Sequence, residues 1–237
     1  MKIPITKPFF GPEELEAVQQ PLKNGWVMQG PFVKQFEDKF SAFTGARYSA
    51  ATTSCTTALH VAVAALGLHP GDEVIVPAFT WISTANVVEH MGAVPVFCDI
   101  DLDTYNIDVN QIESLITDRT VGIIPVHLFG LCADMGPILE IARKHHLWIV
   151  EDAACALGSW YGDNHAGTFG EMGCFSFHPR KSITTGEGGM VATQSDTLNK
   201  LIRSLRDHGV SRSDLAGHAN ASFTAIEYNH LGYNYRM

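Results

Sequence analysis

Lys181 lies in the stretch CFSFHPRKSITTGEGG, residues 174–189, just before a glycine-rich turn. A lysine in such a turn could be a solvated surface charge, a clamp for phosphate or a nucleophile that forms a Schiff base. A nucleotide-binding P-loop has its glycines before the lysine, and here they follow it, so the order excludes that motif. The GEGG run also lacks the GxGxxG spacing of a dinucleotide fingerprint. A solvated surface charge is the default for a lone lysine near a turn; the apolar runs CFSF before it and MVAT after it weaken that interpretation and leave a desolvated nucleophile as an alternative.

Asp152 ends the run LWIVED and is the second candidate for chemistry. An acidic side chain at the end of a strand either caps the helix that follows or pairs with a buried cation. A protonated pyridine nitrogen is such a cation, and a carboxylate beside it makes the ring an electron sink for a developing carbanion. This role requires an aldehyde-bearing cofactor and a lysine that holds it. Lys181 could supply that lysine.

Hydroxyl residues crowd the loop AATTSCTT, residues 50–57, which opens a predicted helix. Such residues usually cap the free amides of a helix start. The same amides, with the positive end of the helix dipole, also bind phosphate, so a cap and an anion site are compatible. His127 after VGIIPV and Ser176 in CFSF are further polar residues at strand ends, where ligands bind in an open α/β sheet.

Short apolar runs alternate with longer helical patterns from residue 46 onward, which is typical of a parallel sheet covered by helices. The runs EVIVP, VPVFCDI, VGIIPV and WIVED are nearly continuously apolar, as expected for strands buried on both faces. The predicted strands are Arg47–Ala51, Glu73–Pro77, Val94–Ile100, Thr120–Val126, Trp148–Glu151, Cys174–Phe177 and Met190–Thr193. The predicted helices are Pro31–Thr44, Thr56–Leu66, Ile82–His90, Val109–Ile116, Met135–His146 and Thr197–His208.

The composition limits the class of protein. The 237 residues are 46% hydrophobic, which is enough for a sizeable core. The net charge of −9, without a run of Lys or Arg, argues against nucleic acid as a partner. The sequence shows neither a signal peptide nor an apolar run of the roughly 20 residues that span a bilayer. Five scattered cysteines without a CxxC pair suggest neither a disulfide framework nor a zinc site, so we expect a cytoplasmic protein with reduced thiols and no metal.

Five motifs together resemble the DegT/DnrJ/EryC1/StrS family of sugar aminotransferases that depend on pyridoxal 5′-phosphate (PLP). They are GDEVIVPAFTWISTAN, GAVPVFCDID, VHLFG, VEDAACALGS and SFHPRKSITTGEGGM, and the resemblance runs from about Gly30 to Met237. It implies the aspartate-aminotransferase-like fold of type I: a three-layer α/β domain with a mostly parallel seven-stranded sheet and helices on both faces. It also implies a homodimer with shared active sites and the transfer of an amino group, commonly from glutamate, to a nucleotide-linked keto-deoxy sugar.

The resemblance assigns roles to residues of this chain by position. Lys181 would hold PLP as a Schiff base and shuttle the proton, and Asp152 would pair with the pyridinium nitrogen. Trp81 would stack on the cofactor ring, and Cys155 takes a position that often carries Gln, His or Glu facing that ring. His127 matches a frequent histidine of the cofactor region.

The remaining roles concern the phosphate of the cofactor. Cys55 and Thr56 take the place of a Gly-Thr pair that grips the phosphate, so Cys55 departs from the family by adding a side chain there. Ser176 matches another phosphate contact. Asn234, in GYNYRM, matches the asparagine that reaches the phosphate of the neighbouring subunit.

Three expectations concern the extent of the chain and its activity. We expect an N-terminal segment over residues 1–30 and a PLP-binding large domain over 31–237, with the smaller C-terminal domain missing because the chain stops at GYNYRM. A branch of the family with histidine in place of the lysine performs dehydration, so Lys181 favours transamination. The alternatives are a truncated, non-catalytic PLP-binding remnant and another PLP enzyme of fold type I, such as a desulfurase or a lyase.

Overall fold

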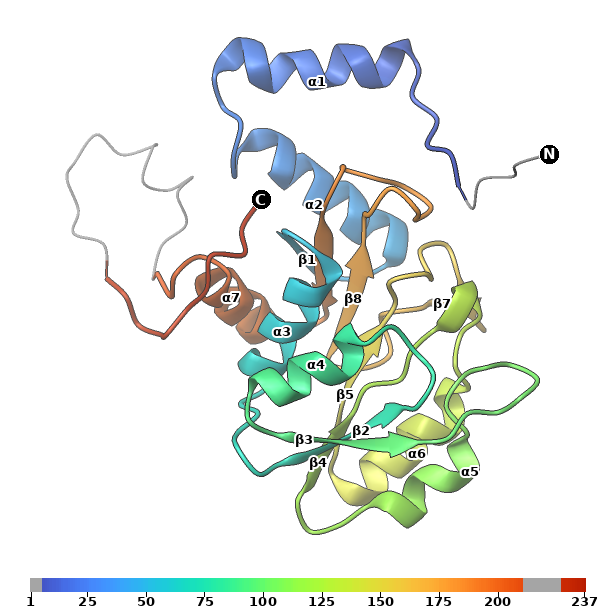
Figure 1. Ribbon diagram of the computed structural model, residues 1–237. Coiled ribbons are helices and arrows are strands. Elements are labelled where there is room, and N and C mark those ends of the chain that lie inside the picture. Colours follow the sequence, from blue (N-terminus) through green and yellow to red (C-terminus); the bar gives the residue numbers. More distant parts are fainter. Residues whose placement is uncertain (1–5, 211–226) are drawn as a thin grey trace.

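A seven-stranded sheet forms the centre of the molecule (Figure 1). The computed structural model describes residues 6–210 and 227–237. Strand β9 runs antiparallel to β1 and β8, and the other neighbouring pairs are parallel. The sheet therefore has the mostly parallel, seven-stranded architecture predicted from the sequence. Its order is β1 (Tyr48–Thr52), β9 (Gly189–Thr193), β8 (Met172–Ser176), β5 (Trp148–Asp152), β4 (Thr120–Ile123), β2 (Glu73–Pro77) and β3 (Val94–Cys98).

Alternate residues of the central strands pack into separate cores on the two faces of the sheet. Val74 and Val150 belong to the core on one face, whereas Ile75 and Ile149, one position away, belong to the core on the other. All five residues of β2 are buried. Apolar side chains on both faces explain why these strands are continuous hydrophobic runs rather than alternating ones.

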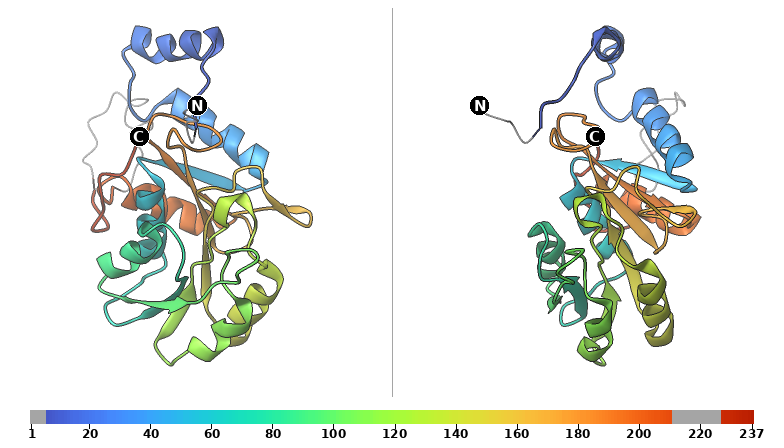
Figure 2. Two further views of the ribbon diagram at one scale, coloured as in Figure 1. Left: turned by 45° about the vertical axis from the view of Figure 1, so that its right-hand side comes forward. Right: turned by 90° about the vertical axis from the view of Figure 1, so that its right-hand side faces the viewer.

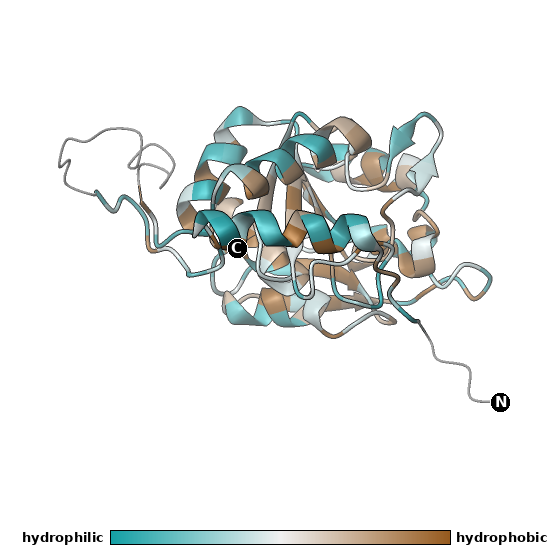
Figure 3. Cartoon of the chain, turned by 90° about the horizontal axis from the view of Figure 1, so that it is seen from above, coloured by the Kyte–Doolittle hydropathy of each residue, from teal (hydrophilic) through white to brown (hydrophobic). Residues whose placement is uncertain are grey.

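Helices cover both faces of the sheet (Figure 2). Side chains of α3 (Cys55–Ala65), α4 (Ser83–His90) and α7 (Asp196–Leu205) pack into the core on one face. Side chains of α5 (Val109–Ile112) and α6 (Met135–His145) pack on the other face. Helix α2 (Pro31–Thr44) lies on that face too, where the ring centroids of its Phe40 and of Phe175 on β8 are 4.9 Å apart. The hydrophobic segments accordingly gather in the sheet between the helices (Figure 3).

Several element boundaries differ from the sequence prediction. The helix predicted over 109–116 is only α5 and a 3₁₀ turn, Glu113–Leu115, because Ile116 is already extended. Strand β4 ends at Ile123 rather than Val126, and Pro125 has no N–H with which to continue the ladder. Strand β3 ends at Cys98 instead of Ile100, and α7 ends at Leu205, three residues before the predicted end.

The sequence prediction missed α1 (Pro12–Asn24) and the small hairpin of β6 (Trp160–Tyr161) and β7 (Asn164–His165). Helix α1 has no buried residue and lies apart from the sheet layers (Figure 1). Its apolar residues Leu15, Val18 and Leu22 follow helical spacing, but they are exposed and Pro21 interrupts the segment. Across residues 6–210 and 227–237, the helices are all too short or too polar to cross a membrane.

Candidate active site

Neighbouring strand ends line up at one edge of the sheet. Asp152, the last residue of β5, is paired with Cys174 of the parallel strand β8. Two residues further on, Ser176 ends β8 and is paired with Gly189, the first residue of β9. Asp152, Ser176 and the start of β9 thus meet where the parallel strands end, which is where open α/β sheets bind ligands.

Asp152 is a buried carboxylate with defined hydrogen bonds. Only 5% of its surface is exposed. Thr84 donates a hydrogen bond of 2.8 Å from its hydroxyl to Asp152 Oδ2, and the Ala154 amide donates to Oδ1 at 3.2 Å. Burial raises the pKa of Asp152, although both hydrogen bonds and the nearby Lys181 act in the opposite direction. A buried carboxylate of this kind is suited to a cationic partner that would neutralise it.

Lys181 lies in the turn between β8 and β9, with its Nζ 3.0 Å from the Sγ of Cys155. The turn is closed by hydrogen bonds from the amides of Lys181 to His178 O and of Thr185 to Phe177 O. The structure thereby places Lys181 and Cys155, two of the predicted site residues, in direct contact.

The start of α3 forms the third side of the site. Ser54 caps the helix by accepting a hydrogen bond from the Thr57 amide, while the amides of Cys55 and Thr56 precede the intrahelical ladder. A Cβ on Gly189 would lie 2.3 Å from the Ser54 carbonyl oxygen and 2.7 Å from the Cys55 nitrogen. Glycine at this position therefore allows β9 to start directly against the amides of the helix.

The electrostatics of this helix start are suited to an anion. Burial and the nearby carboxylate of Asp152 raise the pKa of the Cys55 thiol well above its ordinary value of 9.0. The thiol therefore stays neutral and adds no negative charge beside the amides. Thr56 lies against a second hydroxyl, with its Oγ1 2.8 Å from Ser83 Oγ on α4. Two free amides, two hydroxyls and the helix dipole together make a candidate phosphate site.

Trp81 is part of the loop that leads into α4, and 71% of its surface is exposed. It is therefore not the core residue that a Trp at a helix start often is. The Thr84 amide donates to the Trp81 carbonyl oxygen at 3.1 Å, so the loop that presents the indole is tied to the residue that binds Asp152. An exposed indole here could cover a planar ligand.

Beneath the site, Glu151 is fully buried and accepts four hydrogen bonds. The donors are His127 Nε2 at 2.9 Å and the amides of Gly167, Phe169 and Gly170 at 2.6–2.8 Å. His127 is also fully buried, and its Nδ1 accepts from the Ala133 amide. Since Nδ1 accepts, Nε2 carries the proton that is donated to Glu151. The described contacts of the His127 side chain are thus with Glu151 and Ala133, and they hold the end of β5 in place.

Asn234 occupies a different environment from the other predicted site residues. It is exposed, forms a β-bridge with Asp207, and accepts a hydrogen bond of 2.9 Å from Arg236. Its neighbour Tyr235 is tied to the α3 loop, because the Thr53 amide donates to the Tyr235 carbonyl oxygen at 2.9 Å. The contacts described for Asn234 do not include Lys181 or Asp152. Its side chain is exposed, and its neighbour Tyr235 lies next to the start of α3.

Sequence reasoning missed two residues that shape the site. The motif TWISTAN predicts only a helix around Thr84, yet the Thr84 hydroxyl binds Asp152. The run WIVED predicts Glu151 as the end of a strand, and only the structure shows the four donors around its carboxylate. An acidic residue inside an otherwise apolar buried run is the signal that could have identified Glu151, because a buried charge requires partners.

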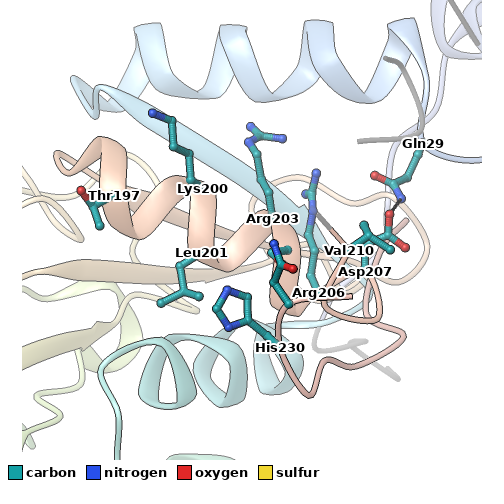
Figure 4. Close-up of a pocket in the computed structure, with 11 residues that line it drawn as sticks. Gln29, Thr197, Lys200, Leu201, Arg203, Arg206, Asp207, Val210 and His230 are labelled. Atoms are coloured by element: carbon teal, nitrogen blue, oxygen red, sulfur yellow. Dashed lines mark hydrogen bonds between the residues drawn. The ribbon is translucent and has the colours of Figure 1, made fainter. Parts of the chain in front are cut away.

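Of two cavities, one lies away from this strand edge and one borders it at Thr53 and Glu187. One of about 550 Å³ runs along α7 and is lined by Lys200, Arg203 and Arg206 (Figure 4). Both arginines are paired with Glu37, at 2.7 and 2.8 Å, and therefore share one carboxylate, while Lys200 pairs with Asp196. The other, of about 540 Å³, is mainly apolar and lies between α1 and the body. In the described part of the chain, no three His, Cys, Asp or Glu side chains gather as they would to hold a metal ion.

Comparison with known proteins shows which family this chain resembles in sequence. Residues 9–237 match the DegT/DnrJ/EryC1/StrS aminotransferase family. The chain is 41% identical to the GDP-perosamine synthase of Caulobacter vibrioides over 237 residues, which is all of this chain and 61% of the synthase.

Solved structures agree in fold. The aminotransferase of Psychrobacter cryohalolentis is 37% identical, with a TM-score of 0.91 over 97% of this chain and 59% of that protein. NtdA of Bacillus subtilis, solved with the bound cofactor PMP, is 34% identical, with a TM-score of 0.81 over 94% of this chain and 48% of that protein. The chain thus spans less than two thirds of the length of each of these relatives.

Proposed function

Because the chain belongs to the DegT/DnrJ/EryC1/StrS aminotransferase family, we propose that the whole protein is a PLP-dependent sugar aminotransferase. It moves an amino group from an amino acid, glutamate by preference, to a nucleotide-linked keto-deoxy sugar. The observation that carries the proposal is the meeting of a buried carboxylate, an accessible lysine and a helix start with free amides at one edge of the sheet.

The residues of this edge fit PLP in charge and in hydrogen-bonding capacity. The ring nitrogen would pair with Asp152, whose burial disfavours a lone negative charge. The phosphate would lie at the α3 start, held by the amides of Cys55 and Thr56 and by the hydroxyls of Thr56 and Ser176. Trp81 would cover the ring with its exposed indole. When bound, PLP supplies an electron sink for the carbanion formed at the α-carbon of the donor.

Lys181 would carry out the proton transfer at the donor. Its Nζ would hold the cofactor in the resting protein and, once released, take the proton from the α-carbon of the amino acid. Lys181 is half-buried, and partial removal of its amine from water favours such a role. Thr84 and Ala154 would keep the Asp152 carboxylate in one orientation throughout, because each binds a different oxygen of that carboxylate.

The acceptor and the assembly are further parts of the proposal. The name of the Caulobacter relative, a GDP-perosamine synthase, supports a nucleotide-linked sugar as acceptor. The outward position of Asn234 beside the α3 start supports a homodimer in which this side chain reaches the phosphate held by the partner. A cytoplasmic location stays a prediction from the sequence.

The test is a half-reaction followed by a full reaction with the full-length protein. With PLP and glutamate but no acceptor, we expect about one equivalent of 2-oxoglutarate per active site. Addition of a nucleotide-linked keto sugar should restore turnover and yield an amino sugar. Lys181→Ala should abolish both steps, whereas Lys144→Ala, which removes an exposed ion pair with Glu113, should change neither. Absence of 2-oxoglutarate from a PLP-loaded protein would contradict the proposal.

A further inference from the structure

The five cysteines of the chain differ in exposure. Cys155 is the exposed one; the partly buried ones are Cys55 and Cys132, and the fully buried ones are Cys98 and Cys174. A peroxide in solution can reach Cys155 directly, since access is one of the two requirements for oxidation of a thiol.

The second requirement is the thiolate form, and the other four cysteines are disfavoured in that respect. Burial, and secondly the carboxylate of Asp152, raises the pKa of the Cys55 thiol well above 9.0. Burial, and secondly the carboxylate of Asp108, raises the pKa of the Cys98 thiol to about 11. Burial raises the pKa of Cys132 and Cys174 as well. A peroxide should therefore oxidise Cys155 before the other cysteines.

Cys155 also has a nucleophile at contact distance. Its Sγ lies 3.0 Å from Lys181 Nζ. The backbone around Cys155 is held by turn hydrogen bonds from the Ala156 amide to Ala153 O and from the Ser159 amide to Ala156 O. It also packs against the neighbouring loop, because a Cβ on Gly130 would lie 3.2 Å from the Cys155 carbonyl oxygen. The pair is thus set in place by the fold and needs little rearrangement to react.

We propose that Cys155 and Lys181 form an oxidative modification site, at which a hydroperoxide produces a covalent S–N cross-link. In the first step the Cys155 thiolate attacks the peroxide. An S–O bond forms, the O–O bond breaks and sulfur is oxidised by two electrons. The hydroxide that leaves takes a proton from the ammonium group of Lys181, which gives water and a neutral amine. In the second step the neutral amine of Lys181 attacks that sulfur. The S–N bond forms, hydroxide leaves, and it takes a proton from the nitrogen to give a second water.

The product is a sulfenamide, and the chain has lost two hydrogen atoms. Two equivalents of a thiol reverse it: the first opens the S–N bond, restores the amine and leaves a mixed disulfide, and the second frees Cys155. The cross-link itself depends only on the two side chains. Its consequence, that a modified Lys181 cannot hold PLP and that bound PLP protects the pair, rests on the proposed function.

The test uses the full-length protein without cofactor, treated with hydrogen peroxide and digested without reduction. Peptide mass spectrometry should detect a linked peptide pair that contains Cys155 and Lys181 and is lighter than the two free peptides by two hydrogen atoms. Dithiothreitol should separate the pair. Unlinked peptides with Cys155 intact, or with Cys155 carried on to sulfinic acid while Lys181 is free, would overturn the proposal.

Three variants sharpen the test. Lys181→Arg keeps a positive charge but removes the amine, so dimedone should trap Cys155 as sulfenic acid in at least a severalfold larger share of molecules than in the parent. Cys155→Ser should show no cross-link. Cys132→Ser, a partly buried cysteine outside the pair, should cross-link as the parent does. Equal dimedone trapping in the parent and in Lys181→Arg would contradict a reaction with the lysine. These readouts are independent of transaminase activity, so the proposed function can fail without the cross-link failing.

Discussion

The hydroxyl of Thr84 and the carboxylate of Asp152 lie 2.8 Å apart although they are 68 positions apart in the chain. This contact joins the first turn of α4 to the end of β5. Thr84 is fully buried, and its amide also donates to the carbonyl oxygen of Trp81. One residue, through its hydroxyl and its amide, thus couples the carboxylate proposed to bind the ring nitrogen with the loop that carries the indole proposed to cover the ring.

Removal of this hydroxyl should weaken cofactor binding without preventing folding. In Thr84→Val the shape is retained, but Asp152 loses a hydrogen bond to a charged group, an interaction that contributes about 1.5–3 kcal/mol. We expect the Kd for PLP to rise about 10- to 100-fold, as measured by titration of visible absorbance. Thr84→Ser keeps the hydroxyl and should bind PLP within a few-fold of the parent. Equal weakening in both variants would show that packing at this position, and not the hydrogen bond, positions Asp152.

The buried charge of Asp152 should lower the stability of the cofactor-free protein. Since burial raises the pKa of this carboxyl above its ordinary 3.8, the folded state is favoured below pH 3.8 and loses that advantage as the pH rises through the shifted value. Asp152→Asn should therefore raise the thermal midpoint at pH 7 and raise it less near pH 4, while weakening PLP binding. Asp163→Asn, on an exposed loop, should alter neither. A variant that is less stable than the parent at pH 7 would contradict this expectation.

Gly189 should tolerate no side chain. In Gly189→Ala the new methyl group would overlap the Ser54 carbonyl and the Cys55 amide, so β9 must move away from the α3 start. We expect a loss of stability of about 1–3 kcal/mol and at least a tenfold loss of affinity for inorganic phosphate or PLP. The matched control is Gly11→Ala, where the nearest atom is the end of the exposed Glu14 side chain at 3.3 Å. Unchanged PLP affinity in Gly189→Ala would exclude this helix start as the phosphate site.

Glu37 on α2 should be a major contributor to stability away from the site. It is 2% exposed and pairs with Arg206 at 2.8 Å and Arg203 at 2.7 Å. Burial alone would raise its pKa, but the two arginines outweigh burial and lower it, so this stabilisation is present above pH 4.5 and is lost as the pH falls below that value. Glu37→Ala leaves the buried Arg206 unpaired and should cost about 3–5 kcal/mol in urea unfolding at pH 7.

Its neighbour provides the control. Asp38 forms an exposed ion pair with Lys34 one turn away, and Asp38→Ala should leave the unfolding midpoint nearly unchanged. If both variants were equally stable, the Glu37 pair would not support the junction of α2 and α7.

The sheet was predictable from the sequence because its strands are buried on both faces. EVIVP and WIVED each carry three consecutive apolar side chains, Val74–Val76 and Trp148–Val150, and each proved to be a strand within one residue of its predicted bounds. The helices that cover the sheet were equally visible from their buried faces. Helix α1 was missed although Leu15, Val18 and Leu22 recur at helical spacing, because this exposed stripe is short and Pro21 falls inside it.

The site was only partly predictable, for a different physical reason. Lys181, Asp152 and Cys55 are marked by their places next to apolar strands and a helix start. Thr84 and Gly189 act through contacts with residues far away in the chain, 68 positions in the case of Thr84 and Asp152, and no local pattern encodes such a contact. The pairing of Cys155 with Lys181 is of the same kind, since it depends on how the loop after β5 folds against the turn after β8.

The most direct test of the account is borohydride reduction of the PLP-loaded protein followed by peptide mapping. We predict visible absorbance that borohydride removes, and a single modified peptide in which the reduced cofactor is fixed to Nζ of Lys181. Lys181→Ala should lack both the absorbance and the modified peptide. PLP fixed to a different lysine, or a protein that stays colourless at saturating PLP, would contradict the account.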